Sequence, residues 1–139
     1  MAEKKTYTLR RHERIKSRKK IELLFREGKH LNLNPLNITY ILTEENGLQV
    51  GVGAGKRYFK KAVHRNKIKR LLRESWRLQK NVLAEKIQDS QKGLAVFVVY
   101  TDKEIPSFSE ISSLVKQVLE RLLTMITKEE NKSFRPGSQ

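Results

Sequence analysis

The chain has 139 residues, which is enough for one domain with a modest hydrophobic core. It holds 30 Lys and Arg residues against 15 acidic ones, so its formal net charge at pH 7 is +15, and it holds no cysteine. The lack of cysteine excludes a disulfide framework and a thiolate metal site, and the strong positive charge is typical of a protein that binds nucleic acid.

The sequence shows neither a membrane span nor a secretory signal. Its longest apolar run, residues 94–100, is too short to cross a bilayer, and no apolar segment follows the charged N-terminus. We therefore expect a cytoplasmic protein with no membrane partner. A soluble domain that is merely basic is the alternative, but the charge is concentrated, because residues 4–20 and residues 56–73 hold nine Lys or Arg residues each.

The first predicted element is a short helix. Residues 1–8 before it show no periodic pattern, and we expect them to form a disordered basic tail. Ser17 is suited to cap the start of the helix, and Gly28 is suited to end it. The helix carries Ile21, Leu24 and Phe25 on one side.

Two strands are predicted next. Apolar residues alternate with more polar ones over 36–42 and again over 48–52, on either side of an Asn-Gly turn, and this pattern predicts a β-hairpin. Tyr40 lies on the first of these strands. Tyr40 and Phe25 are either ordinary core residues or aromatic platforms for unpaired bases, a contact worth roughly 1–3 kcal/mol per base.

A basic helix is predicted from about residue 61 to residue 81. At 100° per residue, one stripe holds Ile68, Leu71, Leu72 and Ser75, and the opposite side holds Asn66, Lys69, Arg70, Arg73 and Arg77. Residues 56–73 contain no acid that could neutralise the cations. Since burial of unpaired cations is costly, this face requires a dense anionic partner such as a nucleic-acid backbone.

The last two elements are a strand and a helix. The continuous apolar run 94–100 predicts a strand covered on both sides, and Ser107 with Glu110 has the spacing of a capping box that opens a C-terminal amphipathic helix. Residues 128–139 are expected to form a disordered tail. The predicted order is α-β-β-α-β-α, a single-domain α+β fold in two layers over residues 9–127.

The sequence offers no protein active site. The glycine-rich stretch 51–56 lacks the spacing of a phosphate loop and of a dinucleotide fingerprint. The three histidines have no metal-ligand spacing, and neither a nucleophile with its base nor a carboxylate cluster for Mg²⁺ is visible. We expect no catalytic residue and no metal ligand in the polypeptide.

The basic helix resembles a known family. The stretch Arg65-Asn66-Lys67-Ile68-Lys69-Arg70 is similar to the Arg-Asn-Arg and Ile-Lys-Arg hallmark of the protein component of bacterial ribonuclease P. The segments 9–15, 24–28, 50–52 and 56–57 and the late apolar strand fit the same family in order and spacing. The resemblance covers about residues 9–126.

This resemblance implies an RNA-binding subunit of a ribonucleoprotein endonuclease that removes the 5′ leader from precursor tRNA. The large RNA subunit would carry the catalytic Mg²⁺, and the protein would bind that RNA and hold the single-stranded leader in a cleft between its sheet and first helix. Binding to DNA is not expected. The resemblance also implies a fold like that of a ribosomal protein, with a left-handed β-α-β crossover where periodicity alone would suggest a right-handed one.

The resemblance also assigns roles to residues. Those that would face the RNA subunit are Lys56, Arg57, Lys60, Lys61, Arg65, Asn66, Lys67, Lys69, Arg70 and Arg73. Those that would line the leader cleft are Ile21, Phe25 and Tyr40. Ile21 departs from the aromatic residue that many relatives carry, and Lys67 keeps a charge but lacks the bidentate fork of arginine.

Two other functions remain open at this point. A ribosomal or chaperone-type protein would bind structured RNA without supporting cleavage. A stand-alone nuclease would cut RNA without an RNA subunit.

Overall fold

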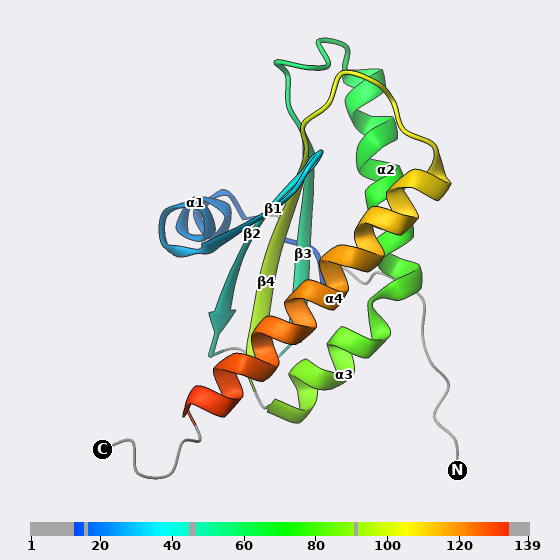
Figure 1. Ribbon diagram of the computed structural model, residues 1–139. Coiled ribbons are helices and arrows are strands. Elements are labelled where there is room, and N and C mark those ends of the chain that lie inside the picture. Colours follow the sequence, from blue (N-terminus) through cyan, green and yellow to red (C-terminus); the bar gives the residue numbers. More distant parts are fainter. Residues whose placement is uncertain (1–12, 16, 45–46, 91, 134–139) are drawn as a thin grey trace.

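The structure, a computed structural model, describes residues 13–15, 17–44, 47–90 and 92–133. Its elements in chain order are α1 (Arg18–Glu27), β1 (Lys29–Leu33), β2 (Leu36–Thr43), β3 (Gly47–Ala54), α2 (Ala62–Gln79), α3 (Asn81–Ser90), β4 (Gly93–Tyr100) and α4 (Phe108–Ser133). Figure 1 shows one sheet with α2, α3 and α4 on one side and α1 on the other. The predicted α+β class is confirmed.

The strand order in the sheet is β1-β2-β4-β3. The predicted hairpin of 36–42 with 48–52 is therefore wrong, because β4 lies between these two strands, antiparallel to β2 and parallel to β3. The hairpin in this sheet joins β1 to β2 through Asn34 and Pro35. The continuous apolar sequence of β4 explains its central position, since both of its faces are covered.

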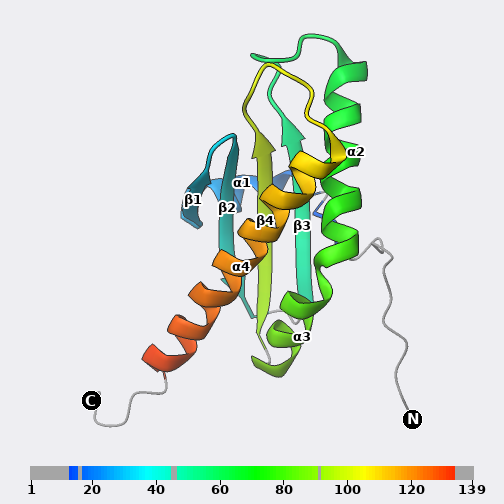
Figure 2. The ribbon, with the colours of Figure 1, turned by 45° about the vertical axis from the view of Figure 1, so that its right-hand side comes forward.

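The connection from β3 to β4 is a left-handed crossover through α2 and α3. In Figure 2 both strands point upward, the two helices lie in front of the sheet, and β4 lies to the left of β3. Right-handed crossovers are the rule for parallel strands. The expectation drawn from the family resemblance is thus confirmed.

The core lies mainly between the sheet and the three helices on one side. Leu36, Ile38 and Tyr40 of β2 point into it, together with α2 and α4 residues such as Trp76 and Leu122. A smaller cluster lies on the other side, where Ile15 and Leu24 pack on Ala95. Because side chains alternate along a strand, the two faces of β2 and β4 serve different partners.

The first helix ends for a different reason than the one expected. Ser17 caps its start as predicted, because its Oγ accepts from the backbone N–H of Lys20 at 3.4 Å. Gly28 at its end is extended, with φ −75°, and not left-handed. A Cβ on Gly28 would lie 2.4 Å from the carbonyl oxygen of Leu24 and 2.9 Å from that of Tyr40, so close packing requires glycine there.

The structure has two elements more than the predicted six, and its last helix extends beyond the expected end. The strand β1 and the separate helix α3, which follows α2 after Lys80, were not predicted. The helix α4 reaches Ser133, so residues 128–133 continue a helix where a disordered tail was expected. Its start is as predicted, since Ser107 Oγ accepts from the N–H of Glu110 at 3.1 Å. Residues 1–8 and 134–139 lie outside the described residues.

Candidate nucleic-acid interface

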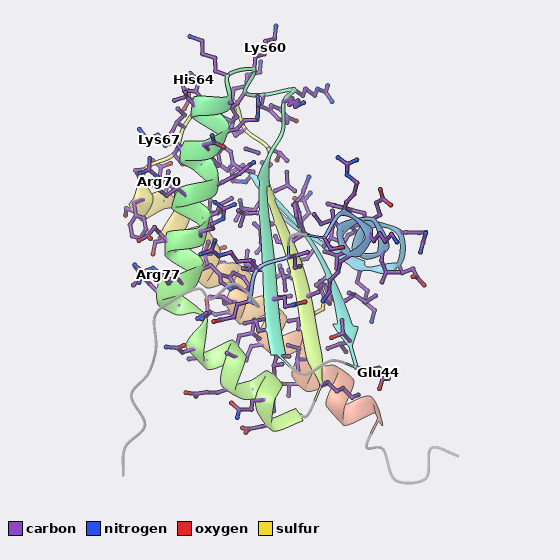
Figure 3. All side chains as sticks on the ribbon, turned by 180° about the vertical axis from the view of Figure 1, so that it is seen from behind. Glu44, Lys60, His64, Lys67, Arg70 and Arg77 are labelled. Carbon is purple, nitrogen blue, oxygen red and sulfur yellow. The ribbon has the colours of Figure 1, made fainter. Side chains whose placement is uncertain are left out.

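The basic segment forms one continuous surface over α2 and the loop before it. We call this surface the basic ridge. Its members are Lys56, Arg57, Lys60, Lys61, Arg65, Asn66, Lys67, Lys69, Arg70 and Arg73, of which Arg65 and Lys69 are half-buried and the others exposed. Figure 3 shows Lys67 and Arg70 along one side of α2 and Lys60 on the loop beyond the start of this helix.

The opposite side of α2 is a core face. Ile68, Leu72, Ser75 and Trp76 are buried there, and Leu71 is half-buried. Since α2 packs against β3 and α4 through this stripe, the ridge cannot turn inward. The predicted division of the helix into a core face and a cationic face is confirmed.

Within the described residues, the cations of the ridge form no salt bridge. In the described part of the chain, the ion pairs near α2 join Arg77 to Glu74 and Lys80 to Glu13, and none includes a ridge side chain. The hydrogen bond from Arg77 lowers the pKa of the Glu74 carboxyl, and the charges of Arg77 and Arg70 lower it further. The positive charge of the ridge is therefore available to an external anion.

Arg65 has a structural role that the sequence pattern did not reveal. Its Nη1 donates to the backbone carbonyls of Phe59 at 2.7 Å and Lys60 at 2.9 Å, in the loop that precedes α2. Phe59 is buried and lies against the ring of Tyr100, with ring centroids 6.2 Å apart. Arg65 thus holds the loop that presents Lys60 and its neighbours.

A second candidate surface is the sheet face beside α1. Phe25 of α1 is 44% exposed, and its ring meets that of Phe97 on β4 edge-on, with centroids 5.3 Å apart. Ile21 packs beneath α1 with Phe97 and Ile41. The exposed Asn37 of β2 lies farther along the same face. Two of the three predicted leader-binding residues, Ile21 and Phe25, therefore lie together.

Phe97 can lie flat on this face because β3 carries glycine beneath it. A Cβ on Gly51 would lie 2.5 Å from the ring of Phe97, and one on Gly53 would lie 3.2 Å from it. The nearby Gln49 accepts a hydrogen bond from Lys20 of α1.

Neither Phe97 nor Gln49 was predicted from the sequence as part of this surface. Side chains alternate between the two faces along β4. Phe97 lies between the core residues Val96 and Val98, so this alternation could have placed Phe97 on the opposite face.

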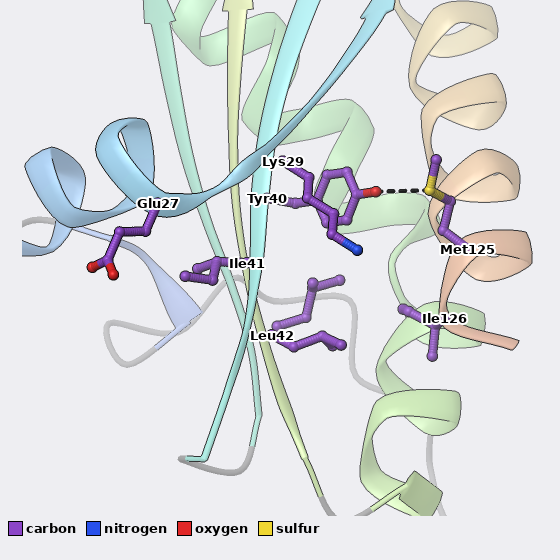
Figure 4. Close-up of a pocket in the computed structure, with 8 residues that line it drawn as sticks. Glu27, Lys29, Tyr40, Ile41, Leu42, Met125 and Ile126 are labelled. Atoms are coloured by element: carbon purple, nitrogen blue, oxygen red, sulfur yellow. Dashed lines mark hydrogen bonds between the residues drawn. The ribbon is translucent and has the colours of Figure 1, made fainter. Parts of the chain in front are cut away.

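The structure corrects the position of Tyr40. Its side chain is 7% exposed and lies on the opposite face of the sheet, where its hydroxyl donates to the sulfur of Met125 at 2.7 Å (Figure 4). It lines a cavity of about 200 Å³ beneath α4, together with Leu42 and Ile126. Leu36, Ile38 and Tyr40 are alternate residues of β2, so their side chains point to the same face of the sheet. Tyr40 therefore cannot line a cleft beside Phe25, which lies on the other face.

A polar cavity joins the two surfaces. It has a volume of about 260 Å³ and lies at the outer edge of β3, between Arg14 of the N-terminal segment and Arg73 of α2. Residues 50–52 of β3 form its floor, and the N–H of Ile15 donates to the carbonyl of Val50 at 2.9 Å. Arg73 therefore lies at the boundary of the ridge that is nearest to the α1 face.

No helix among the described residues is long and apolar enough to cross a membrane. Within the same residues, no group of three or more His, Cys, Asp or Glu side chains is arranged to hold a metal ion.

Known proteins resemble this chain in sequence and in fold. The sequence model of the ribonuclease P family matches residues 9–123. The ribonuclease P protein component of Porphyromonas gingivalis is 32% identical over 120 residues, which cover 84% of this chain and 88% of the relative. That of Chlorobaculum tepidum is 31% identical and covers 89% of this chain and 88% of the relative.

Solved structures give the same result. The RNase P protein from Thermotoga maritima has a TM-score of 0.65 at 26% identity, over 78% of this chain and 96% of that chain. The Staphylococcus aureus RNase P protein has a TM-score of 0.62 at 20% identity, over 79% and 94%, and shows the same fold. The basic ridge, the left-handed crossover and these matches lead to one conclusion: the chain belongs to the ribonuclease P family, as a protein component of that endoribonuclease.

Proposed function

We propose that the protein binds the RNA subunit of ribonuclease P through the basic ridge and the 5′ leader of precursor tRNA on the sheet face beside α1. The observation that carries this proposal is the ridge itself, because nine cations lie on one surface with no carboxylate within salt-bridge distance in the described part of the chain. Neutralising phosphates releases counterions, so affinity for RNA falls steeply with salt. Family membership does not favour a chaperone or ribosomal role.

The leader would bind beside Phe25 and Phe97. An unpaired strand presents base faces that stack on aromatic rings without strong sequence preference. Phe25 is 44% exposed, and Phe97 is half-buried on the same face. Arg14 and Arg73, at the edge of β3, lie between this face and the ridge and would hold a phosphate of the strand that passes from one to the other.

Catalysis would belong to the RNA subunit. Neither a nucleophile with a base nor a carboxylate cluster occurs on the two surfaces described above, so the protein side chains would bind and orient RNA. Mg²⁺ would be held mainly by the RNA, and the protein would favour its binding by ordering the RNA around it. The complex would act in the cytoplasm.

A reconstitution tests this function. The purified chain, a ribonuclease P RNA subunit, precursor tRNA and Mg²⁺ are combined at near-physiological salt, where the RNA alone cleaves poorly, and each component is also assayed alone. We expect 5′ leader removal that requires the RNA subunit and is stimulated by the protein. Cleavage by the protein alone would show a stand-alone nuclease, and absence of stimulation would refute the proposed role.

The leader surface has a matched control within the chain. Phe25 and Phe108 are similarly exposed, at 44% and 40%, but Phe108 begins α4 on the other side of the sheet. We expect Phe25→Ala to weaken holoenzyme binding to precursor tRNA by about 1–3 kcal/mol, the value of one stacked base. Mature tRNA, which has no leader, should bind with unchanged affinity, and Phe108→Ala should change neither. Equal losses for precursor and mature tRNA would contradict the leader assignment.

A further inference from the structure

The helix α1 covers one end of the sheet face on which it lies. Ile41 of β2 and Ala95 of β4 are Cα partners, and both pack beneath α1. Two residues farther along each strand, Thr39 lies opposite Phe97, whose ring meets that of Phe25 on α1. Because side chains alternate along a strand, the next residues on this face lie about 7 Å beyond Phe97.

The next residues on this face include two asparagines, which we call the amide pair. Asn32 of β1 and Asn37 of β2 are Cα partners, and Val99 of β4 lies opposite Asn37 in turn. Both asparagines are exposed, and within the described part of the chain neither side-chain amide has a hydrogen-bond partner. Side chains directly opposite each other have Cβ atoms about 4.5–5.5 Å apart, so the two amides lie side by side on the same face as Phe97.

The hairpin that carries the amide pair is fixed on both sides of the pair. At its tip, the backbone N–H and the hydroxyl of Thr101, which follows β4, both donate to the carbonyl of Pro35 at 2.8 Å. On the other side, His30 lies opposite Thr39, and its Nδ1 is 3.1 Å from the threonine hydroxyl oxygen. The backbone beneath the amide pair is therefore ordered before a ligand arrives, which reduces the entropy lost on binding.

Asparagine is an unfavourable residue for a strand. It is depleted in β-sheets, and positions at which a residue departs from the local preference are typical of functional sites. Each asparagine amide offers two N–H donors and one carbonyl acceptor and carries no charge. Such groups match the neutral polar parts of a nucleotide, which are the edge of its base and the 2′-hydroxyl of its ribose.

We propose that the amide pair donates and accepts hydrogen bonds at the base edge or the 2′-hydroxyl of one leader nucleotide, next to the nucleotide that stacks beside Phe25 and Phe97. This role rests on the proposed binding of the leader to the sheet face beside α1. Stacking alone accepts every base, because each base has a π-face. The amide pair therefore determines which nucleotide chemistry is preferred at one leader position, and it adds no electrostatic affinity.

Binding of the reconstituted holoenzyme to precursor tRNA tests this role. We expect Asn32→Ala and Asn37→Ala each to weaken precursor binding about three- to tenfold, the value of a net hydrogen bond, and to leave binding of mature tRNA unchanged. Gln117→Ala, which removes an exposed amide from α4 on the other side of the sheet, should change neither. Asn37→Thr should weaken precursor binding likewise and keep the urea midpoint of unfolding, because threonine favours a strand.

Modified leaders identify the group that the amide pair contacts. Each leader position in turn receives either a nonpolar base of the same shape or a 2′-deoxyribose, and each substrate is measured with the parent protein and with Asn37→Ala. At one position, the leader change and Asn37→Ala should together cost less than the sum of their separate costs. Such a shortfall with the nonpolar base identifies the base edge, and a shortfall with the deoxyribose identifies the 2′-hydroxyl.

Three results would overturn the proposal. They are unchanged precursor binding in Asn37→Ala, additive losses at every leader position, and a smaller salt slope in Asn37→Ala, which would show a phosphate contact. If Phe25→Ala still separates precursor from mature tRNA, these results refute the amide pair alone. If Phe25→Ala weakens both equally, the leader face itself is refuted.

Discussion

Removal of the Glu13 carboxylate is the sharpest test of how the N-terminal segment is held on the fold. Glu13 pairs with Nζ of Lys80, the residue between α2 and α3. The Lys80 side chain is only 4% exposed, and that of Glu13 is 17% exposed. Glu13→Gln keeps the shape of the side chain and removes the negative charge that faces the buried Lys80 ammonium.

The expected cost follows from this burial. Breaking a buried ion pair by removing one partner costs about 3–5 kcal/mol, and the partial exposure of Glu13 favours the lower end of that range. With a urea dependence of roughly 2 kcal/mol per molar, a loss of about 3 kcal/mol lowers the urea midpoint by about 1.5 M. Urea unfolding followed by circular dichroism measures this shift.

Two controls separate the pair from general surface effects. Glu22→Gln on α1 removes an exposed carboxylate and should change stability by less than about 0.5 kcal/mol. Lys80→Met removes the buried charge, so adding Glu13→Gln to it should cost far less than Glu13→Gln alone, with a coupling of about 2 kcal/mol. A loss below about 0.5 kcal/mol for Glu13→Gln, or additive losses in the double variant, would refute this account.

Further variants test individual parts of the structure. Arg65→Ala should lower the midpoint of thermal unfolding, because the hydrogen bonds of Arg65 hold the loop before α2. Arg70→Ala should leave that midpoint unchanged and should reduce the salt slope of RNA binding by about 0.7–0.9 for each phosphate that is no longer neutralised. The reverse pattern in these two variants would contradict both roles. Gly51→Ala should displace the ring of Phe97, seen as a changed aromatic NMR signal, and weaken precursor binding; an unmoved ring would count against the close approach of Gly51 to this ring. Burial, followed by the charge of Asp102, raises the pKa of the Tyr100 phenol to about 12, whereas the pKa in the unfolded chain is about 10. The fold therefore favours the neutral phenol, and about 2–3 kcal/mol of stability is lost as the pH rises from 10 to 12. Tyr100→Phe should lose that much less over this interval in urea unfolding, and parallel losses would show that the phenol is not responsible.

The sequence predicted the elements whose pattern was strong and local. The helix around Ile68 and Leu72 and the capped helix after Ser107 have long amphipathic stripes, and both occur as expected. The stretch Lys29–Leu33 has only two apolar residues, so its strand gave too weak a signal. The helix α3 was hidden because its pattern follows α2 after a single residue, Lys80.

Neighbour relations in the sheet could not be read from local pattern. An Asn-Gly turn between two alternating segments favours a hairpin, but the run at 94–100 buries more apolar surface when it has a strand on each side. The same limit applies to the candidate site. The alternation of side chains along β2 places Tyr40 on the face opposite to α1. This alternation is informative only when the face that each helix covers is known.

The central place of β4 has a consequence for biosynthesis. Before residue 93 leaves the ribosome, β3 has no neighbouring strand within the sheet and β2 has only β1. Most of the strand pairing in the sheet therefore waits for a segment made late, and closing so large a loop is slow. The nascent chain exposes two apolar strands with unpaired edges next to its most cationic helix during this interval. Early capture of that helix by a polyanion would keep such chains apart and so limit their aggregation.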